Sequence, residues 1–324
     1  MHESGCADGP GAACVLGATS TPAPGIPGPR HGVCGPVKES EPWHAAGEET
    51  GTVTIPLVVG VDGSEASLEA VDWAAAEAVR HGVPLRLLHA AAGEPEASGV
   101  ISAASERAGK SAPAVRLSSE VSHEDAVCAL VGHGRNAFAL VLGNRGLGGL
   151  PGMLLGSVGL AVAARAGCPV VVVRGAPEHR STRFGCVVVG VEDGEGSGTA
   201  VDFALREAHV RRCRLVALHA WSPPSGACTT PQASSWQLEA HRRPPAQVLD
   251  DALRRPAEKY RDAEVSRRLV EKPARPALLE AASTADLLVV GARRRLDHPG
   301  LQLGLINHAL LHHAPCPVAV VPRR

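Results

Sequence analysis

Residues 58–78 read VVGVDGSEASLEAVDWAAAEA, and residues 188–208 read VVGVEDGEGSGTAVDFALREA. The two stretches align without a gap at an offset of 130, which places Asp62 opposite Glu192. A second block repeats at an offset of 148, where LVLGNRG and GCPVVVVR of the first copy return as LVVGARR and PCPVAVVP. Self-similarity of this length indicates a duplicated structural unit. The sequence therefore predicts two domains of the same fold in one chain.

Within the first copy, apolar runs alternate with segments of helical periodicity. The strand-like runs are IPLVVGVD, PLRLLHA, AVRLSSEV, FALVLGN and CPVVVVR, and helices are expected near residues 65–81, 98–109, 123–135 and 157–166. Strands that are mostly apolar throughout and alternate with helices are typical of a parallel sheet covered on both faces. Each copy is thus predicted to be a doubly wound α/β domain with a five-stranded parallel sheet. Only about 22 residues separate LLHA from AVRLSSEV, so the helix between them is expected to be short and one wall of a pocket thin.

The chain divides into a compositionally biased N-terminal segment and the two copies. Residues 1–52 are rich in Gly, Pro, Ala and Ser without apolar periodicity, so we expect a disordered tail whose deletion leaves the rest folded. The first domain is expected at residues 53–176 and the second at residues 183–324. Each is long enough to bury its own core.

Composition excludes several classes of function. The formal net charge is -1, so the chain lacks the surplus of positive charge typical of proteins that bind nucleic acid or membrane surfaces. No apolar run is long enough to span a bilayer, and no basic segment followed by an apolar core opens the chain. Nine cysteines are scattered without metal-binding spacing, which favours a reducing compartment. We therefore expect a cytoplasmic protein that binds neither nucleic acid nor membrane.

A glycine-rich loop lies between an apolar run and an alanine-rich helix of the first copy. It has the form G-x2-G-x9-G-S, carried by Gly143, Gly146, Gly156 and Ser157. A helix N-terminus offers free amides and a favourable dipole to phosphate, and the serine hydroxyl adds a donor. Glycine leaves room for a ribose or phosphate near the backbone, and the Asp62 carboxylate suits ribose hydroxyls or Mg²⁺. The alternative is a glycine-rich turn that satisfies only its own geometry.

The first copy contains the runs VVGVDGS, LLHA, LGNRG and LLGSVGLAVAARAGCPVVVVR, and the second copy repeats this pattern. Together they resemble the universal stress protein family in its tandem, two-domain form. The resemblance covers residues 54–324 and implies a fold like that of the adenine nucleotide α-hydrolases. It also implies binding of ATP, with Mg²⁺ as its companion ion. The ATP-binding residues implied by position are Asp62, Ala90, Gly143, Gly146, Gly156, Ser157 and Val158.

The second copy departs from this pattern. It retains Gly291 and Gly304 but has Arg294 where the first copy has Gly146, Leu305 where it has Ser157, and an acid one carbon longer at Glu192. An arginine in the phosphate path either fills the pocket or recognises a different anion. We expect a degenerate, mainly structural second site.

Other motifs are set aside. The GKS at residues 109–111 lacks the leading glycine and the preceding strand of a P-loop, and GLGGLPG has Pro151 where a dinucleotide-binding motif needs glycine. The histidines of NHALLHHAPC include His308 and His312, an i, i+4 pair, but no carboxylate completes a metal site. No metal ligand is therefore assigned.

We interpret the chain as an ATP-binding module in stress response or regulation, acting through a protein partner that the sequence does not identify. No general base or lysine converges on the phosphates, so no catalytic residue is assigned. Two alternatives remain open: a slow ATPase or adenine nucleotide hydrolase with Asp62 holding Mg²⁺, and a nucleotide-free interaction scaffold. The final apolar runs, CPVVVVR and CPVAVVP, are expected to pair within the chain about a pseudo-twofold axis, with a homodimer as the other arrangement.

Overall fold

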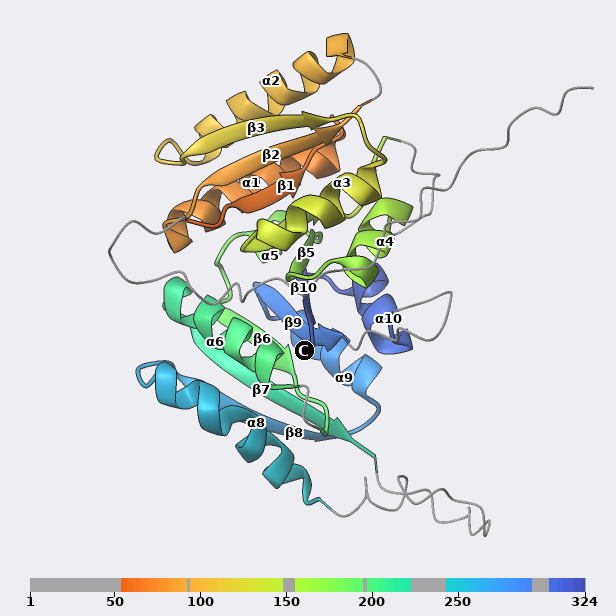
Figure 1. The fold of residues 1–324 in the computed structure, drawn as a ribbon. Helices are drawn as coiled ribbons and strands as arrows, with labels where there is room; N and C mark the ends of the chain where they lie inside the picture. Colours follow the sequence, from red (N-terminus) through yellow and green to blue (C-terminus); the bar gives the residue numbers. More distant parts are fainter. Residues whose placement is uncertain are drawn as a thin grey trace, which may run out of the picture. The chain divides into compact units, whose positions relative to one another are not determined.

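The computed structural model describes residues 54–91, 94–147, 155–194, 197–222, 243–292 and 303–323. The predicted tail, residues 1–52, lies outside these ranges. Each copy of the repeat forms one half of the fold, called a lobe below. In the first lobe, strands and helices alternate as predicted (Figure 1). The strands are β1 (Leu57–Gly60), β2 (Leu85–Ala90), β3 (Leu117–Ser122), β4 (Ala139–Gly143) and β5 (Val170–Val173), and the helices are α1 (Glu65–His81), α2 (Glu94–Ser111), α3 (Ala126–His133) and α4 (Ser157–Arg165).

The second lobe repeats this order. Its strands are β6 (Cys186–Gly190), β7 (Arg214–Trp221), β8 (Val265–Glu271), β9 (Leu287–Ala292) and β10 (Val318–Pro322), and its helices are α6 (Gly198–Arg211), α8 (Pro245–Lys259), α9 (Ala274–Ala282) and α10 (Leu305–His313). The short helix α5 (Pro177–Arg180) lies in the connection between the lobes. There Arg180 pairs with Glu69 of the first lobe, and His179 Nδ1 lies 3.1 Å from Ala285 O of the second. The connection is therefore anchored to both lobes.

The short helix expected between the second and third strands was a wrong prediction. Helix α2 has 18 residues, because it begins four residues after β2 and β3 starts only at Leu117. The connections on either side are brief, so a full-length helix fits into the interval.

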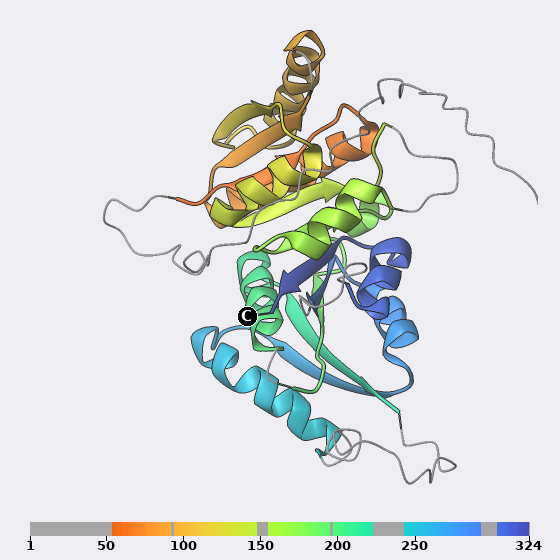
Figure 2. The same cartoon turned by 45° about the vertical axis from the view of Figure 1, so that its right-hand side comes forward.

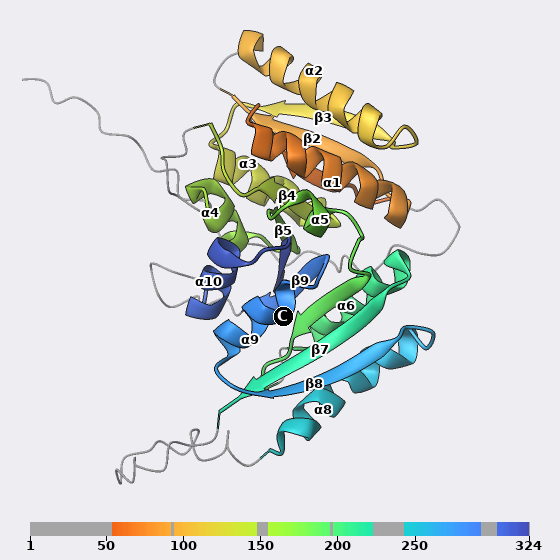
Figure 3. The same ribbon diagram turned by 180° about the vertical axis from the view of Figure 1, so that it is seen from behind.

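All ten strands form one sheet in the order β3-β2-β1-β4-β5-β10-β9-β6-β7-β8. Pairing is parallel within each lobe, and the lobes join where β5 and β10 pair antiparallel, with Val171 opposite Ala319. Figures 1 and 3 show β3 and β8 at the two ends of the sheet and this junction in the middle. The predicted fold is therefore confirmed. Its two five-stranded sheets are continuous, and the predicted pairing of the last strands is observed.

Helices cover both faces of the sheet. Along β1, Leu57 and Val59 belong to one buried cluster with α1, α2, α6 and α8, and Val58 belongs to a second cluster with α3, α4, α9 and α10. Figure 2 shows α4 and α10, in green and dark blue, beside the junction of the lobes. Because both faces are covered, the strands are apolar without alternation, as the sequence pattern predicts. The carboxyl ends of the strands remain the edge where a ligand fits.

Helix α1 begins and ends with local capping that fixes its position beside β1. Ser64 is the N-cap, and its Oγ accepts a hydrogen bond from Ser67 N at 3.2 Å. Gly82 ends the helix in the left-handed region at φ 66°, which suits glycine because it has no Cβ. The start of α1 thus lies directly after Asp62, at the carboxyl end of β1.

Candidate functional site

A cavity of about 400 Å³ opens at the carboxyl ends of β1, β2 and β4 in the first lobe. The same cavity is bordered by the N-terminus of α4. All seven ATP-binding residues that the resemblance implies line it: Asp62, Ala90, Gly143, Gly146, Gly156, Ser157 and Val158. The structure therefore brings together residues that lie up to 96 positions apart in the chain.

Asp62 is held by hydrogen bonds from both sides of the cavity. Its Oδ1 accepts from Ser64 N at 3.0 Å and Ser64 Oγ at 2.6 Å, and its Oδ2 accepts from Leu147 N at 3.1 Å. Burial alone would raise the pKa of Asp62, but the hydrogen bonds from Ser64, Ser67 and Leu147 outweigh it and lower the pKa below its usual value. The carboxylate is therefore ionised and ties the glycine loop to the end of β1.

The glycines of the loop have different physical reasons to be glycine. A Cβ on Gly143 would lie 2.5 Å from Ala66 O, in the backbone of α1, and a Cβ on Gly146 would collide with Asp62 Oδ2. Contacts within the protein therefore already disfavour a side chain at these two positions, whether or not a ligand approaches them. Gly156 differs, since a Cβ there would meet only ordinary contacts at 3.9 Å. Its missing side chain leaves room on the cavity side.

The first turn of α4 presents free donors to the cavity. Gly156 is the N-cap, its own N–H donates to Asn144 O at 2.9 Å, and no side chain caps the helix. The amides from Ser157 to Gly159 lie in the first turn of the helix, where a backbone N–H has no carbonyl partner within the helix. The Ser157 side chain is exposed beside them. This arrangement suits an anion, because the amide dipoles and the hydroxyl add in one direction.

The rest of the wall contains residues that the sequence analysis did not select. Leu88, Leu130, Leu142 and Leu155 give it an apolar surface, and Arg145 lines it from the glycine loop. An arginine inside a phosphate-type loop is a signal that could have been found, since it stands between Gly143 and Gly146. The four leucines belong to ordinary strands and helices, and nothing in the sequence distinguishes them from core residues.

In the second lobe a side chain of the protein lies against Gly291, the counterpart of Gly143. Arg323, directly after β10, lies over Gly291, where a Cβ would meet its Nε at 2.9 Å. Its guanidinium pairs with Glu192 and is only 8% exposed. Asn307, in the first turn of α10, donates its side-chain N–H to Gly291 O at 2.9 Å. Arg294, which was expected either to fill the pocket or to recognise a different anion, lies outside the described residues.

The GKS and NHALLHHAPC motifs, to which the sequence analysis gave no function, do not line the cavity. The GKS lysine, Lys110, lies in the last turn of α2 and pairs with Glu106 at 2.6 Å. His308 and His312 stack with ring centroids 4.4 Å apart. Cys316 is fully buried, and burial raises the pKa of its thiol to about 12, as expected for an inert cysteine. No helix in the described ranges combines the length and the apolar character that crossing a membrane requires.

Comparison with known proteins extends over both lobes. The profile of the universal stress protein family matches residues 56–174 and 184–322. A universal stress protein of Mycobacterium tuberculosis is 33% identical over 299 residues, covering 82% of this chain and 94% of that protein. The crystal structure of a universal stress protein from Archaeoglobus fulgidus is similar in fold, with a TM-score of 0.59 at 17% identity over 84% of this chain and 100% of that chain. A solved universal stress protein in complex with cAMP is 33% identical over 38% of this chain and 98% of that chain, with a TM-score of 0.33.

The internal repeat agrees with these matches, because each copy of the repeat coincides with one matched segment. The mycobacterial relative also spans most of the chain. The chain therefore belongs to the universal stress protein family, with two domains of that family in tandem.

Proposed function

We propose that the first lobe binds ATP and that the protein acts as a nucleotide-binding module in stress response or regulation. One observation carries the proposal: an ionised carboxylate, an apolar wall and a helix N-terminus without a side-chain cap converge on a single cavity. Cavities of about this size, mostly apolar with a few converging polar groups, are typical of small-molecule sites.

Each part of the cavity suits one part of ATP. The adenine would lie against the apolar wall, with backbone groups at Ala90 beside it. The ribose hydroxyls would donate to Asp62, whose lowered pKa keeps it an acceptor. The phosphates would accept from the amides after Gly156 and from the Ser157 hydroxyl, with Arg145 offering a positive charge.

Magnesium would accompany the phosphates. Mg²⁺ prefers oxygen ligands and usually keeps several waters, with one or two carboxylates and substrate phosphates completing its shell. Among the described lining residues, Asp62 is the single carboxylate, and both of its oxygens already accept hydrogen bonds. We therefore assign Asp62 to the ribose and leave the ion to the phosphates and water.

We propose binding without dedicated catalysis. Of the described residues that line the cavity, Asp62 and Arg145 are the ionisable ones. A carboxylate with a lowered pKa is a weak general base, and arginine does not transfer protons at neutral pH. The five cysteines in the described ranges are free thiols, which favours the cytoplasm as the site of action.

Mass spectrometry of the ligand released from freshly purified protein tests the proposal. We expect an adenine nucleotide, and a rise in melting temperature when ATP is added to the emptied protein. Absence of both would contradict nucleotide binding and support the scaffold alternative. Steady-state phosphate release above background that is lost in Asp62→Asn would instead support the ATPase.

A further inference from the structure

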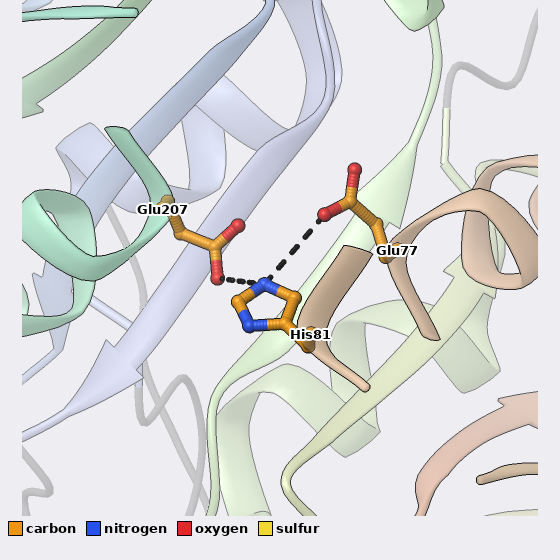
Figure 4. Close-up of side chains that lie close together, drawn as sticks. All are labelled: Glu77, His81 and Glu207. Carbon is orange, nitrogen blue, oxygen red and sulfur yellow. Dashed lines mark ion pairs between the residues drawn. The ribbon is translucent and has the colours of Figure 1, made fainter. Parts of the chain in front are cut away.

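Four buried polar side chains meet where α1 of the first lobe contacts α6 of the second. They are related by the repeat, since Glu77 corresponds to Glu207 and His81 to Arg211 at the offset of 130. All four side chains are at most 5% exposed. Figure 4 shows the His81 ring between the two carboxylates. Burying such a cluster costs free energy unless its charges are matched by one another or by a bound ion.

Three donor atoms face one another within this cluster. His81 Nε2 lies 3.0 Å from Glu207 Oε1 and 3.7 Å from Glu77 Oε2, and the three ligand atoms all lie within 4.8 Å of one another (Figure 4). Glu77 Oε2 is buried and accepts no hydrogen bond from the described part of the chain. A buried carboxylate oxygen without a hydrogen bond is a point at which a further ligand can be held.

The remaining carboxylate oxygens are held from outside the triad. Arg211 Nη2 lies 2.8 Å from Glu77 Oε1, and Arg211 Nη1 pairs with Glu207 Oε2. Arg80, at the solvent side, also pairs with Glu77 Oε1. Each carboxylate therefore uses one oxygen for arginine and turns the other toward His81. Arginine thus orients the two carboxylates in the way that outer partners orient metal ligands.

We propose that Glu77 Oε2, His81 Nε2 and Glu207 Oε1 bind a divalent transition-metal ion of the zinc class between the lobes. Imidazole and carboxylate are ligands that Zn²⁺ accepts, at bond lengths of about 2.0 to 2.2 Å. Four-coordinate ligands at that length lie roughly 3.3 Å apart, so the three atoms, which lie within 4.8 Å of one another, would need only small side-chain shifts to hold an ion.

The two arginines set the expected strength of the site. Their charges already balance the two carboxylates, so an added dication is repelled as well as attracted. A proton on His81 Nε2 also competes for the same position. We therefore expect a reversible site that is weaker than a closed structural zinc site.

The site is independent of the proposed nucleotide cavity. His81 ends α1, whereas Ser64 and Asp62 lie at its start, and 17 helical residues span about 25 Å. Ligands come from α1 of one lobe and α6 of the other, so a bound ion would add a bond across the interface. Metal binding is thus expected to raise the melting temperature without changing the affinity for ATP.

The test is a calorimetric titration with ZnCl₂ after removal of bound metal by a chelator. The full chain carries His308→Ala and His312→Ala as its background, because that surface pair could bind zinc separately. We expect one zinc ion per chain, and at least a tenfold loss of affinity when His81→Gln is added. His133→Gln, which alters a histidine beside Glu120 in the first lobe, is the matched control and should leave binding unchanged.

Anomalous X-ray scattering at the zinc edge, from crystals of the background protein soaked in ZnCl₂, covers the case in which His81→Gln fails to fold. A peak within bonding distance of His81 Nε2 and both carboxylates supports the proposal. No zinc binding by the background protein, equal binding by His81→Gln, or a peak elsewhere without one at His81 would overturn it.

Discussion

In the first lobe the space beyond β1 and β4 is a cavity that reaches Asp62 and the start of α4, whereas in the second lobe the Arg323 side chain lies against Gly291, the counterpart of Gly143. The first lobe keeps Gly159 where the second has Asn307, whose side chain donates to Gly291 O. Glu192 is one carbon longer than Asp62 and pairs with Arg323, whereas Asp62 accepts hydrogen bonds from Ser64 and Leu147. The two lobes therefore differ in side chains at equivalent positions, and we expect nucleotide binding in the first lobe alone.

The frame around both sites is nevertheless the same. His89 Nδ1 lies 2.7 Å from Val61 O, and His219 Nδ1 lies 2.9 Å from Val191 O, so each lobe joins its first two strands in one way. Ser67 also has its counterpart in Ser197, and each accepts from the backbone N–H of the acidic residue. Among the described residues, the differences between the lobes include Asn307 and the pair of Glu192 with Arg323.

The largest expected effect comes from Gly156→Val in the first lobe. A valine side chain would occupy the space through which phosphate approaches the α4 amides, so we expect ATP affinity to fall at least about a hundredfold. Gly304→Val is the matched control, since both glycines are N-caps with extended backbone (ψ 151° and 156°) and neither has a neighbour that blocks a Cβ. Affinity should be unchanged in the control, as measured by calorimetry. Equal losses in the two variants would contradict the assignment.

Ser157→Ala should have a smaller effect. It removes one hydroxyl donor to a charged phosphate, worth about 1.5 to 3 kcal/mol, or about ten- to a hundredfold in Kd. Leu305→Ala changes the equivalent exposed position of the second lobe and should not alter Kd. An unchanged Kd for Ser157→Ala would show that the hydroxyl points away from the bound phosphates.

Arg323→Ala examines the contact at Gly291 directly. The Glu192 side of the pair is screened by water, so the loss in free energy of unfolding, measured by chemical denaturation, should come mainly from the packing of the buried arginine stem. We expect no second ATP site in this variant, because the Asn307 side chain still occupies the position that Gly159 leaves bare. A second site would mean that Arg323 alone closes the lobe.

The smallest effect is a pH dependence from Asp62. Its pKa in the folded protein lies below the ordinary value of 3.8, so ionised Asp62 stabilises the fold above that value. This contribution is lost as the pH falls through the lowered pKa. The difference in free energy of unfolding between the wild type and Asp62→Asn should therefore be constant near neutral pH and shrink below about pH 4. A difference that grows on acidification would contradict the hydrogen bonds described for Asp62.

The sequence predicts which residues meet at the cavity of the first lobe because the pattern that marks them is local. Gly156 and Ser157 adjoin each other at a helix start, and Asp62 ends an apolar strand, so the parallel-sheet rule brings them to one edge. The reason for Gly143 was missed, since its close contact with the backbone of α1 appears only once the helix is packed.

The position of Arg323 and the junction between the lobes depend on long-range contacts. Arg323 reaches Gly291 only because β10 pairs with β9, and no motif marks the residue after the last strand. Glu77 and Glu207 did carry a signal, because charged residues recur at equivalent positions on alanine-rich helices that face a core. The pattern shows that such residues are buried, but not that His81 and Arg211 face them from two lobes.

Calorimetric titration of ATP into the emptied wild-type protein tests the central claim most directly. The account predicts a stoichiometry near one nucleotide per chain, carried by the cavity at Asp62 and Gly156, and the same value in Gly304→Val. Two nucleotides per chain, or loss of the single site in Gly304→Val, would place binding in the second lobe and contradict it.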